Sequence, residues 1–242
     1  MKKTHFGFET IDAAQKEKRV ADVFDSIAAH YDLMNDLASF GLHRRWKRNM
    51  VDRLAVHEEA DILDLAGGTG DLTRLFLEKC PRATVILSDI NATMLRLGRA
   101  KLIRQNFSPL VLQCNAEALP FADQTFDAVS IGFGLRNITD KEKTLAEMRR
   151  VLRPGGIAAI LEFSRVAGFL APFYDFYSFT VLPKLGALIS GDQASYRYLA
   201  ESIRVHPDQE KLRKMMLHAG FDEAEYYNMT FGIVAVHVGY VH

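Results

Sequence analysis

The strongest constraint on the fold of this chain is an alternation of short apolar runs with amphipathic stretches in its middle part. Apolar runs lie at 61–66, 83–89, 110–115, 126–134 and 157–164, and helical spacing of apolar residues appears at 72–80, 92–105 and 139–153. Strands that alternate with helices pair in parallel, and helices then cover both faces of the sheet. The sequence therefore predicts an α/β fold around a mostly parallel sheet.

Both ends of the chain extend this pattern. Residues 13–54 carry apolar residues at helical spacing, which predicts two or three helices before the first strand. A helix is expected at 208–221, with Gly220 near its C-cap, and two strands that meet near 228–232 should then form an antiparallel hairpin. The predicted sheet is Rossmann-like and has seven strands.

Residues 165–206 follow a strand but lack a simple crossover pattern. We interpret them as a helical lid inserted into a main domain of residues 59–242, which follows an N-terminal helical cap over 1–58. Six aromatic residues fall between positions 169 and 179, and prolines and charges interrupt the stretch too often for a bilayer span. The aromatic side chains are either ordinary core or an apolar entrance for a hydrophobic substrate.

Composition excludes several classes of protein. The 30 basic and 30 acidic side chains balance, so no overall field gathers nucleic acid, and none is expected as a partner. Cys80 and Cys114 lack metal-ligand spacing, which predicts no metal site and favours a reducing cytoplasm. The start, MKKTHFGFET, has no apolar segment behind it. We expect no signal peptide, no membrane-spanning helix and a cytoplasmic location.

The stretch DILDLAGGTGDL, residues 61–72, places three glycines among Asp61, Asp64 and Asp71. A glycine turn after the first strand of such a sheet indicates close approach of a ligand. The stretch lacks the last glycine of a dinucleotide fingerprint and the lysine of a P-loop, and its carboxylates disfavour phosphate. A nucleoside without phosphate and with a positive charge fits better, and S-adenosylmethionine is such a ligand.

The next two strands support this interpretation. Asp89 ends the second strand, about twenty residues after the glycines, where a carboxylate accepts hydrogen bonds from ribose hydroxyls. Asn115 ends the third strand, where its amide would lie beside adenine. Since ligands bind outside the carboxyl ends of the strands, the three features together predict a class I methyltransferase-like domain that uses S-adenosylmethionine.

Longer motifs resemble one family. The segments YDLMNDLASFGLHRRW (31–46) and RVLRPGGIAAILEFS (150–164) resemble signature motifs of the ubiquinone/menaquinone biosynthesis C-methyltransferases, the UbiE family, and GFGLRNITDKEK (132–143) and SYRYLAESIRVHPDQE (195–210) are similar to it too. The resemblance implies a bacterial enzyme that methylates a ring carbon of a polyprenylated quinol, on the menaquinone path, the ubiquinone path or both.

The resemblance also implies cofactor positions. The residues expected to bind S-adenosylmethionine are Asp64, Gly67, Thr69, Asp89, Ile90, Asn115, Ala116 and Gly132. Gly132 stands where the family leads us to expect serine, so a backbone contact should replace one hydroxyl. Ala38 stands where a larger apolar residue is usual, and Arg153 where lysine is commoner, and neither departure changes the assignment.

Methylation of a ring carbon requires deprotonation of a neighbouring phenol, whose free pKa is about 10. We predict Arg136, Asn137 and Tyr31 as catalytic residues. Arg136 would stabilise the phenolate and orient a water that takes the proton, Asn137 would anchor a quinol oxygen, and Tyr31 would approach the ring. The alternative for Arg136 is a surface pair with Asp140.

Other assignments stay open at this point. His43 is a second candidate base, and Glu162 either accepts a proton or binds backbone amides. The segment HRRWKR (43–48) is interpreted as a solvated helix face, with contact to anionic lipid headgroups as the alternative. A homodimer, a quinone-biosynthesis complex and peripheral contact with the inner membrane are further possible partnerships. The rival functions are methylation of another small aromatic or lipid acceptor and a non-catalytic scaffold.

Overall fold

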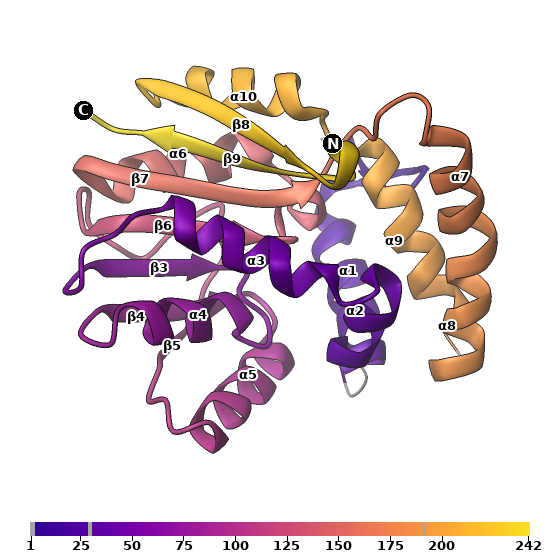
Figure 1. The fold of residues 1–242 in the computed structure, drawn as a ribbon, viewed down its shortest axis with the longest axis horizontal. Helices are drawn as coiled ribbons and strands as arrows, with labels where there is room; N and C mark the ends of the chain where they lie inside the picture. Colours follow the sequence, from indigo (N-terminus) through magenta and orange to yellow (C-terminus); the bar gives the residue numbers. More distant parts are fainter. Residues whose placement is uncertain (1–2, 29–30, 191) are drawn as a thin grey trace.

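A seven-stranded sheet forms the centre of the computed structural model, which describes residues 3–28, 31–190 and 192–242 (Figure 1). The strands are β3 (Asp61–Leu65), β4 (Thr84–Asp89), β5 (Leu110–Gln113), β6 (Phe126–Gly132), β7 (Leu152–Phe163), β8 (Glu223–Met229) and β9 (Val234–Tyr240). Their order is β5-β4-β3-β6-β7-β9-β8, with β9 antiparallel to both of its neighbours and the other pairs parallel. The predicted sheet and its C-terminal hairpin are confirmed.

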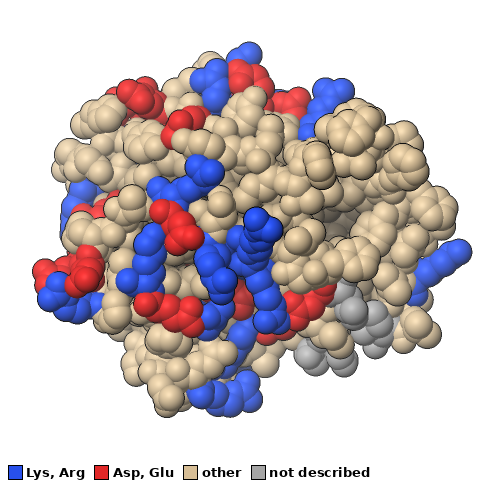
Figure 2. All heavy atoms as spheres, viewed as in Figure 1, with Lys and Arg blue, Asp and Glu red and all other residues tan. Residues whose placement is uncertain are grey.

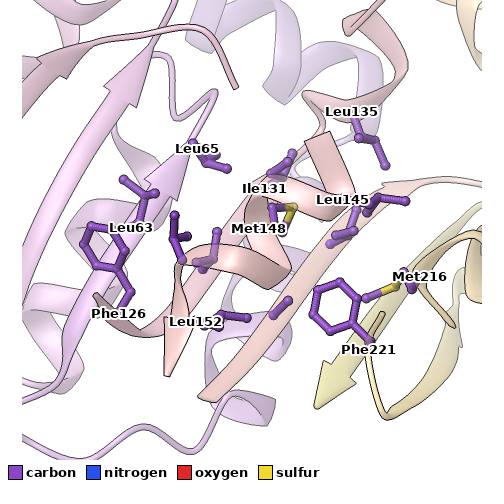
Figure 3. Packing of buried hydrophobic residues seen from close by; sticks show 14 of the residues in the cluster. Leu63, Leu65, Phe126, Ile131, Leu135, Leu145, Met148, Leu152, Met216 and Phe221 are labelled. Carbon is purple, nitrogen blue, oxygen red and sulfur yellow. The ribbon is translucent and has the colours of Figure 1, made fainter. Parts of the chain in front are cut away.

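Helices cover both faces of this sheet. They are α4 (Asp71–Lys79), α5 (Ala92–Arg104), α6 (Lys141–Val151) and α10 (Gln209–His218). On one face, Leu63 and Ile131 pack with Met148 of α6 and Met216 of α10 (Figure 3). On the other face, Ile62 packs in a cluster with Met50 of α3 (Leu42–Arg53) and Phe76 of α4. Because β3 is buried on both sides, its apolar run is nearly continuous.

The N-terminal part holds three helices, as predicted: α1 (Ala13–Ile27), α2 (Tyr31–Ser39) and α3 (Leu42–Arg53). The expected cap of residues 1–58 includes residues 1–2 and 29–30, which lie outside the described ranges. A hairpin of β1 (Lys3–Phe6) and β2 (Glu9–Asp12) precedes α1 and was not predicted. Its strands are short and largely polar, so they carry little of the alternation that marks a strand in sequence.

The inserted segment is helical, as predicted. Helix α7 (Ala171–Phe176) continues through a π-helical turn, η3 (Tyr177–Val181), into α8 (Leu182–Ser190), and α9 (Gln193–Val205) returns beside them (Figure 1). The Tyr177 hydroxyl donates to the Ala38 carbonyl at 3.0 Å, which joins the insert to α2. Among the described residues, no helix is long and apolar enough to cross a membrane.

One strand begins earlier than predicted. Helix α6 ends at Val151, and β7 runs from Leu152 through the Pro-Gly-Gly segment instead of starting at residue 157. The register with β6 shifts, because Leu152 pairs with Phe126 and Ile157 with Ala128. The extra residues of β7 bulge out of the ladder there, and Gly155, with a φ of 81°, allows the bend.

Candidate active site

The glycine turn between β3 and α4 brings backbone N–H groups to the end of β4. Gly68 and Gly70 have φ angles of 55° and 79°, which glycine adopts without strain. The Gly68 N–H donates to Asp89 Oδ2 at 3.0 Å, and the Asn91 N–H donates to Asp89 Oδ1 at 2.9 Å. Each carboxylate oxygen keeps a second lone pair, so Asp89 can still accept hydrogen bonds from a ligand. Burial raises the pKa of Asp89, against the opposite effect of these N–H groups.

Close packing holds the turn in this position. A Cβ on Gly67 would lie 2.5 Å from Leu87 Cδ1, and a Cβ on Gly98 of α5 would lie 2.6 Å from the Gly68 carbonyl oxygen. Both positions therefore require glycine, which lets α5 and β4 approach the turn directly. Gly67 acts through this packing, and a direct contact of Gly67 with a cofactor stays a prediction.

Two of the three aspartates of the turn do not offer free negative charge. Asp61 lies at the opposite end of β3, where it pairs with Arg153 at 2.8 Å. Asp71 binds Lys47 at 2.7 Å and Lys101 at 2.8 Å. Burial alone would raise the pKa of Asp71, but the two ammonium groups outweigh it and hold that pKa well below its ordinary value. The expectation that these carboxylates attract a bound cation is wrong for both residues.

Asp64 and Thr69 support the turn from within the protein. The carboxylate of Asp64 is fully buried, and it accepts from the Thr73 N–H at 3.0 Å, the Thr73 hydroxyl at 2.7 Å and the Ser130 hydroxyl at 3.0 Å. Burial raises the pKa of Asp64 to about 6. The Thr69 hydroxyl donates to Asp32 Oδ1 at 3.0 Å. Neither residue lines the nearby cavity, and their direct contact with a cofactor stays a prediction.

A cavity opens at the carboxyl ends of β3, β4, β5 and β6, beside the glycine turn. Five of the predicted cofactor residues line it: Asp89, Ile90, Asn115, Ala116 and Gly132. Helix α1 forms the opposite wall with Glu17, Val20 and Phe24, which were not predicted. Helical periodicity alone did not single them out, because it does not say which residues of a cap face a cavity. No group of three or more potential metal ligands occurs within the described residues.

The glycine at position 132 has a structural reason in this chain. A Cβ at Gly132 would lie 2.7 Å from Leu72 Cδ1, and Leu72 is 4% exposed. The side chain of Leu72 therefore occupies the space that a serine at position 132 would need. The wall of the cavity is built from backbone at this point.

A second cavity adjoins the first and contains all three predicted catalytic residues. Tyr31 and Asn137 line both cavities, and Arg136 lines the second one. Phe133, which follows β6, also lines both. The turn η2 (Leu135–Asn137) thus brings Arg136 and Asn137 to the junction, and α2 brings Tyr31 from the other side.

Arg136 is buried and paired, so the alternative of a surface residue is wrong. Its side chain is 8% exposed, and Nη1 donates to Glu162 Oε1 at 2.9 Å. Glu162 also accepts the backbone N–H groups of Arg136 at 3.2 Å and Phe163 at 2.9 Å, as one of the two sequence interpretations held. Glu162 thus compensates the charge of Arg136 while fixing the backbone of η2.

Tyr198 of the lid is a neighbour of the site that the sequence did not identify. Its hydroxyl donates to Asn137 Oδ1 at 3.0 Å, and its ring stacks on Phe6 of β1 with 4.2 Å between ring centroids. Burial raises the pKa of Tyr198 to about 12, which keeps the hydroxyl protonated as a donor. The amide NH₂ group of Asn137 is therefore oriented away from Tyr198.

His43 also lines the second cavity. Its Nε2 lies 2.8 Å from Asp36 Oδ1, and burial, with Lys47 nearby, lowers its pKa. In the segment 43–48, the arginines are exposed as expected, but His43, Trp46 and Lys47 are buried, which corrects the interpretation of a fully solvated face. The apolar side of α3 packs Trp46 onto the sheet, and this packing brings His43 and Lys47 inward as well.

Comparison with known proteins identifies the family. A model of the ubiE/COQ5 methyltransferase family matches residues 12–241. The chain belongs to this family. The ubiquinone/menaquinone biosynthesis C-methyltransferase UbiE of Klebsiella pneumoniae is 56% identical over 98% of this chain and 96% of the relative. The protein of that name from Hahella chejuensis is 54% identical, with the same shares covered.

Solved structures show the same fold at low identity. A SAM-dependent methyltransferase from Aquifex aeolicus has a TM-score of 0.58 and 15% identity, over 80% of this chain and 88% of that one. Phosphoethanolamine N-methyltransferase 2 of Haemonchus contortus, in complex with S-adenosyl-L-methionine, has a TM-score of 0.58 and 19% identity, over 76% of this chain and 38% of that one. As a family member with this fold, the chain is an S-adenosylmethionine-dependent methyltransferase.

Proposed function

We propose that this chain transfers a methyl group from S-adenosylmethionine to a ring carbon of a polyprenylated quinol, with the cofactor in the first cavity and the ring in the second. C-methylation in ubiquinone and menaquinone biosynthesis is the activity of the family. The observation that carries the assignment of the two cavities is their shared wall, because Tyr31 and Asn137 line both. A sulfonium in the first cavity and a ring in the second would therefore both lie beside Tyr31 and Asn137, and orientation by these shared side chains would favour their approach.

Asp89 holds the ribose in this proposal. Its two oxygens are fixed by the Gly68 and Asn91 N–H groups, and their remaining lone pairs accept the two ribose hydroxyls. Asn115 and Ala116 line the first cavity, and in this proposal they lie beside the adenine. The cofactor supplies the electrophilic methyl group, and the residues of the chain bind and orient it.

Arg136 and Asn137 act on the acceptor. Since Glu162 compensates the charge of Arg136, the guanidinium acts mainly as an oriented donor, through Nε, which is buried and has no hydrogen-bond partner within the described residues. The Asn137 carboxamide oxygen is held by Tyr198, which leaves its NH₂ group to donate to a quinol oxygen. His43 faces the same cavity with a lowered pKa and takes the phenol proton, either directly or through a water.

Two substitutions separate cofactor binding from turnover. Arg136→Ala should retain cofactor affinity and lose about 100-fold or more in turnover, because it removes donors to the acceptor oxygen. Asp89→Ala should weaken cofactor binding about tenfold or more, because the ribose hydroxyls lose their acceptor. Calorimetry with S-adenosylhomocysteine and transfer of labelled methyl to reduced demethylmenaquinone and to the methoxy-benzoquinol measure the two effects.

Glu59→Ala, an exposed position on the loop before β3, is the matched control and should change neither quantity. Loss of turnover in Arg136→Ala that is explained by lost cofactor affinity would contradict the role of Arg136. Equal turnover of unrelated phenols would favour another acceptor, and cofactor binding without any turnover would favour a scaffold.

We further propose that the aromatic outer face of the lid rests on the membrane that holds the substrate. Phe169, Phe173 and Phe176 are 68%, 73% and 64% exposed. Two exposed phenylalanines from outside the lid extend this face. The ring of Phe231 lies 5.9 Å from that of Phe169, and the ring of Phe40 lies 5.8 Å from that of Tyr177, between centroids. Apolar patches of this kind are uncommon on proteins without a partner.

Basic residues lie next to this aromatic face. Figure 2 shows few charged side chains over the lid and a group of Lys and Arg side chains beside it, around α3. The exposed Arg44, Arg45 and Arg48 belong to α3, which begins two residues after Phe40. Aromatic side chains that enter the interface and arginines that attract anionic headgroups form a typical lipid-binding combination.

Liposome flotation tests the lid face. Phe173→Glu with Phe176→Glu should reduce binding to anionic vesicles about tenfold or more, and charge reversal at Arg44 and Arg45 should reduce it with a steeper effect at low salt. Ile103→Glu, at an exposed apolar position of α5, is the control and should float like the unchanged protein. Flotation that none of these substitutions changes would remove the proposal.

A further inference from the structure

Behind Arg136 lies a third cavity, of about 430 Å³, which neither cavity of the proposed reaction includes. It opens to solvent and is bordered by the β1–β2 hairpin, the start of α6, the end of α9 and the start of α10. Basic side chains are the most frequent kind on its wall, where they outnumber the two carboxylates: Lys3, His5, Lys16, Arg136, Lys141, His206 and Lys211. We call it the basic chamber.

Two lysines of the basic chamber, the buried Lys16 and the half-buried Lys141, share a single acceptor. Lys16 of α1 is 3% exposed, and its Nζ donates to the Ile138 carbonyl at 3.1 Å. Lys141 Nζ donates to the same carbonyl oxygen at 3.0 Å. Each ammonium has three protons, so the pair keeps donors that this carbonyl does not use. Burial lowers the pKa of Lys16 to about 7, with Lys141 adding to the effect and Glu117 opposing it.

Further polar atoms of the chamber wall lack a partner. Both ring nitrogens of His206 are buried and without a hydrogen-bond partner in the described part of the chain. Burial and the neighbouring cations hold the pKa of His206 well below its ordinary value, so the neutral ring offers one N–H donor. A buried polar atom without a partner is costly, so such atoms gathered around one cavity call for a group that satisfies them.

The carboxylates nearby are already engaged. Glu162 accepts the Arg136 guanidinium and two backbone N–H groups. Glu117 accepts the Asp140 N–H at 2.9 Å, and Asp140 caps α6 by accepting the Lys143 N–H at 3.1 Å. Glu142 also lines the wall, but it is exposed, so water can solvate its carboxylate. The hydrogen bonds that Lys16 and Lys141 donate to Ile138 go to a carbonyl oxygen and not to a carboxylate.

A group that only accepts hydrogen bonds complements such a wall. We propose that the basic chamber binds a small oxyanion, phosphate-like or carboxylate, held by Lys16, Lys141 and His206. Because Arg136, Tyr198 and Ser202 line both this chamber and the second cavity, the oxyanion would lie directly behind the loop that carries Arg136 and Asn137. Occupancy of the chamber would hold the Ile138 carbonyl and its two lysines in place.

Calorimetry on the full chain, without cofactor or acceptor, tests the proposal independently of methyl transfer. Sulfate and phosphate are the tetrahedral probes, and acetate is the carboxylate probe. Lys16→Gln and Lys141→Gln should each weaken binding by about tenfold or more, since each removes a charge-assisted donor. Lys184→Gln, at an exposed position of α8, should leave it unchanged. Preference for sulfate or for acetate identifies the class of oxyanion.

The pH dependence gives a second measurement that does not need a variant to fold. Sulfate keeps its charge from about pH 6 to about pH 8, whereas Lys16 loses its proton in this range, with Lys141, His206 and Glu117 as the charged or titratable groups around it. Sulfate affinity should therefore fall severalfold as pH rises. No uptake of any probe, or uptake insensitive to both lysine substitutions and to pH, would overturn the proposal.

Discussion

At the scale of single residues, several charged side chains of the site form ion pairs within the protein. Arg136 is compensated by Glu162, and Asp71 by Lys47 and Lys101. A carboxylate with such a partner offers little free negative charge to a ligand. Asp89 differs at the cofactor cavity, because among the described residues its hydrogen-bond partners are backbone N–H groups.

Gly132→Ser tests the packing beside the cofactor cavity. The new side chain would meet Leu72 Cδ1, so we expect a loss of about 1–3 kcal/mol in the free energy of unfolding, typical of overpacking. In a Leu72→Val background the same substitution should cost less, because the clashing methyl group is withdrawn. Denaturant unfolding of the unchanged protein, the two single variants and the double variant measures the coupling free energy between the two positions. If the two losses of unfolding free energy simply add, the proposed clash between the two side chains is contradicted.

At the scale of elements, the N-terminal hairpin links the chain start to the lid and the site. Phe6 stacks on Tyr198, which holds Asn137, and the Phe8 N–H donates to Glu201 of α9 at 3.2 Å. The hairpin is thus a support for the acceptor cavity even though it is far from the sheet. Its few contacts also make it an element that can open locally while the rest stays folded.

Gly7→Ala should destabilise the packing of this hairpin on α9. Gly7 has a φ of 57°, and an added Cβ would lie 2.3 Å from Glu201 Oε2, so we expect about 1 kcal/mol of local destabilisation. Hydrogen exchange should become faster in β1 and β2 and unchanged in β3 and β6. Gly168→Ala is the matched control, since a Cβ there meets nothing within 4 Å. Equal protection of β1 and β2 in both variants would show that the glycine is not required.

At the scale of the whole molecule, buried histidines connect stability to pH. His237 of β9 is 1% exposed, its Nε2 lies 2.9 Å from the Gln209 carbonyl oxygen, and burial lowers its pKa to about 4. The folded state therefore binds the proton more weakly than the unfolded state does. Its contribution to stability is complete above the unfolded pKa of about 6.5 and is lost as pH falls toward 4.

His237→Gln should reduce this acid sensitivity. The pKa difference corresponds to about 3 kcal/mol between neutral and acid conditions, which the variant lacks. The pKa of Asp64 is raised to about 6, so its protonation stabilises the folded state as pH falls and opposes the effect of His237. Asp64 is present in both proteins, so the test compares the unfolding free energies of the unchanged protein and the variant at each pH. Denaturant midpoints from about pH 7.5 to about pH 4.5 measure it, and parallel curves would contradict the assignment.

Periodicity and turn chemistry act over a few residues, so the sheet, its flanking helices, the glycine turn and the strand-end positions of Asp89 and Asn115 could be predicted from the sequence. Arg136 and Asn137 could be named as catalytic candidates from their place after the strand at 126–134 and from the motif resemblance. The contacts of these residues became known from the tertiary structure alone. Glu162, Tyr198 and the basic chamber come from segments far apart in the chain, and charge compensation and burial arise where such segments meet, which no local pattern records.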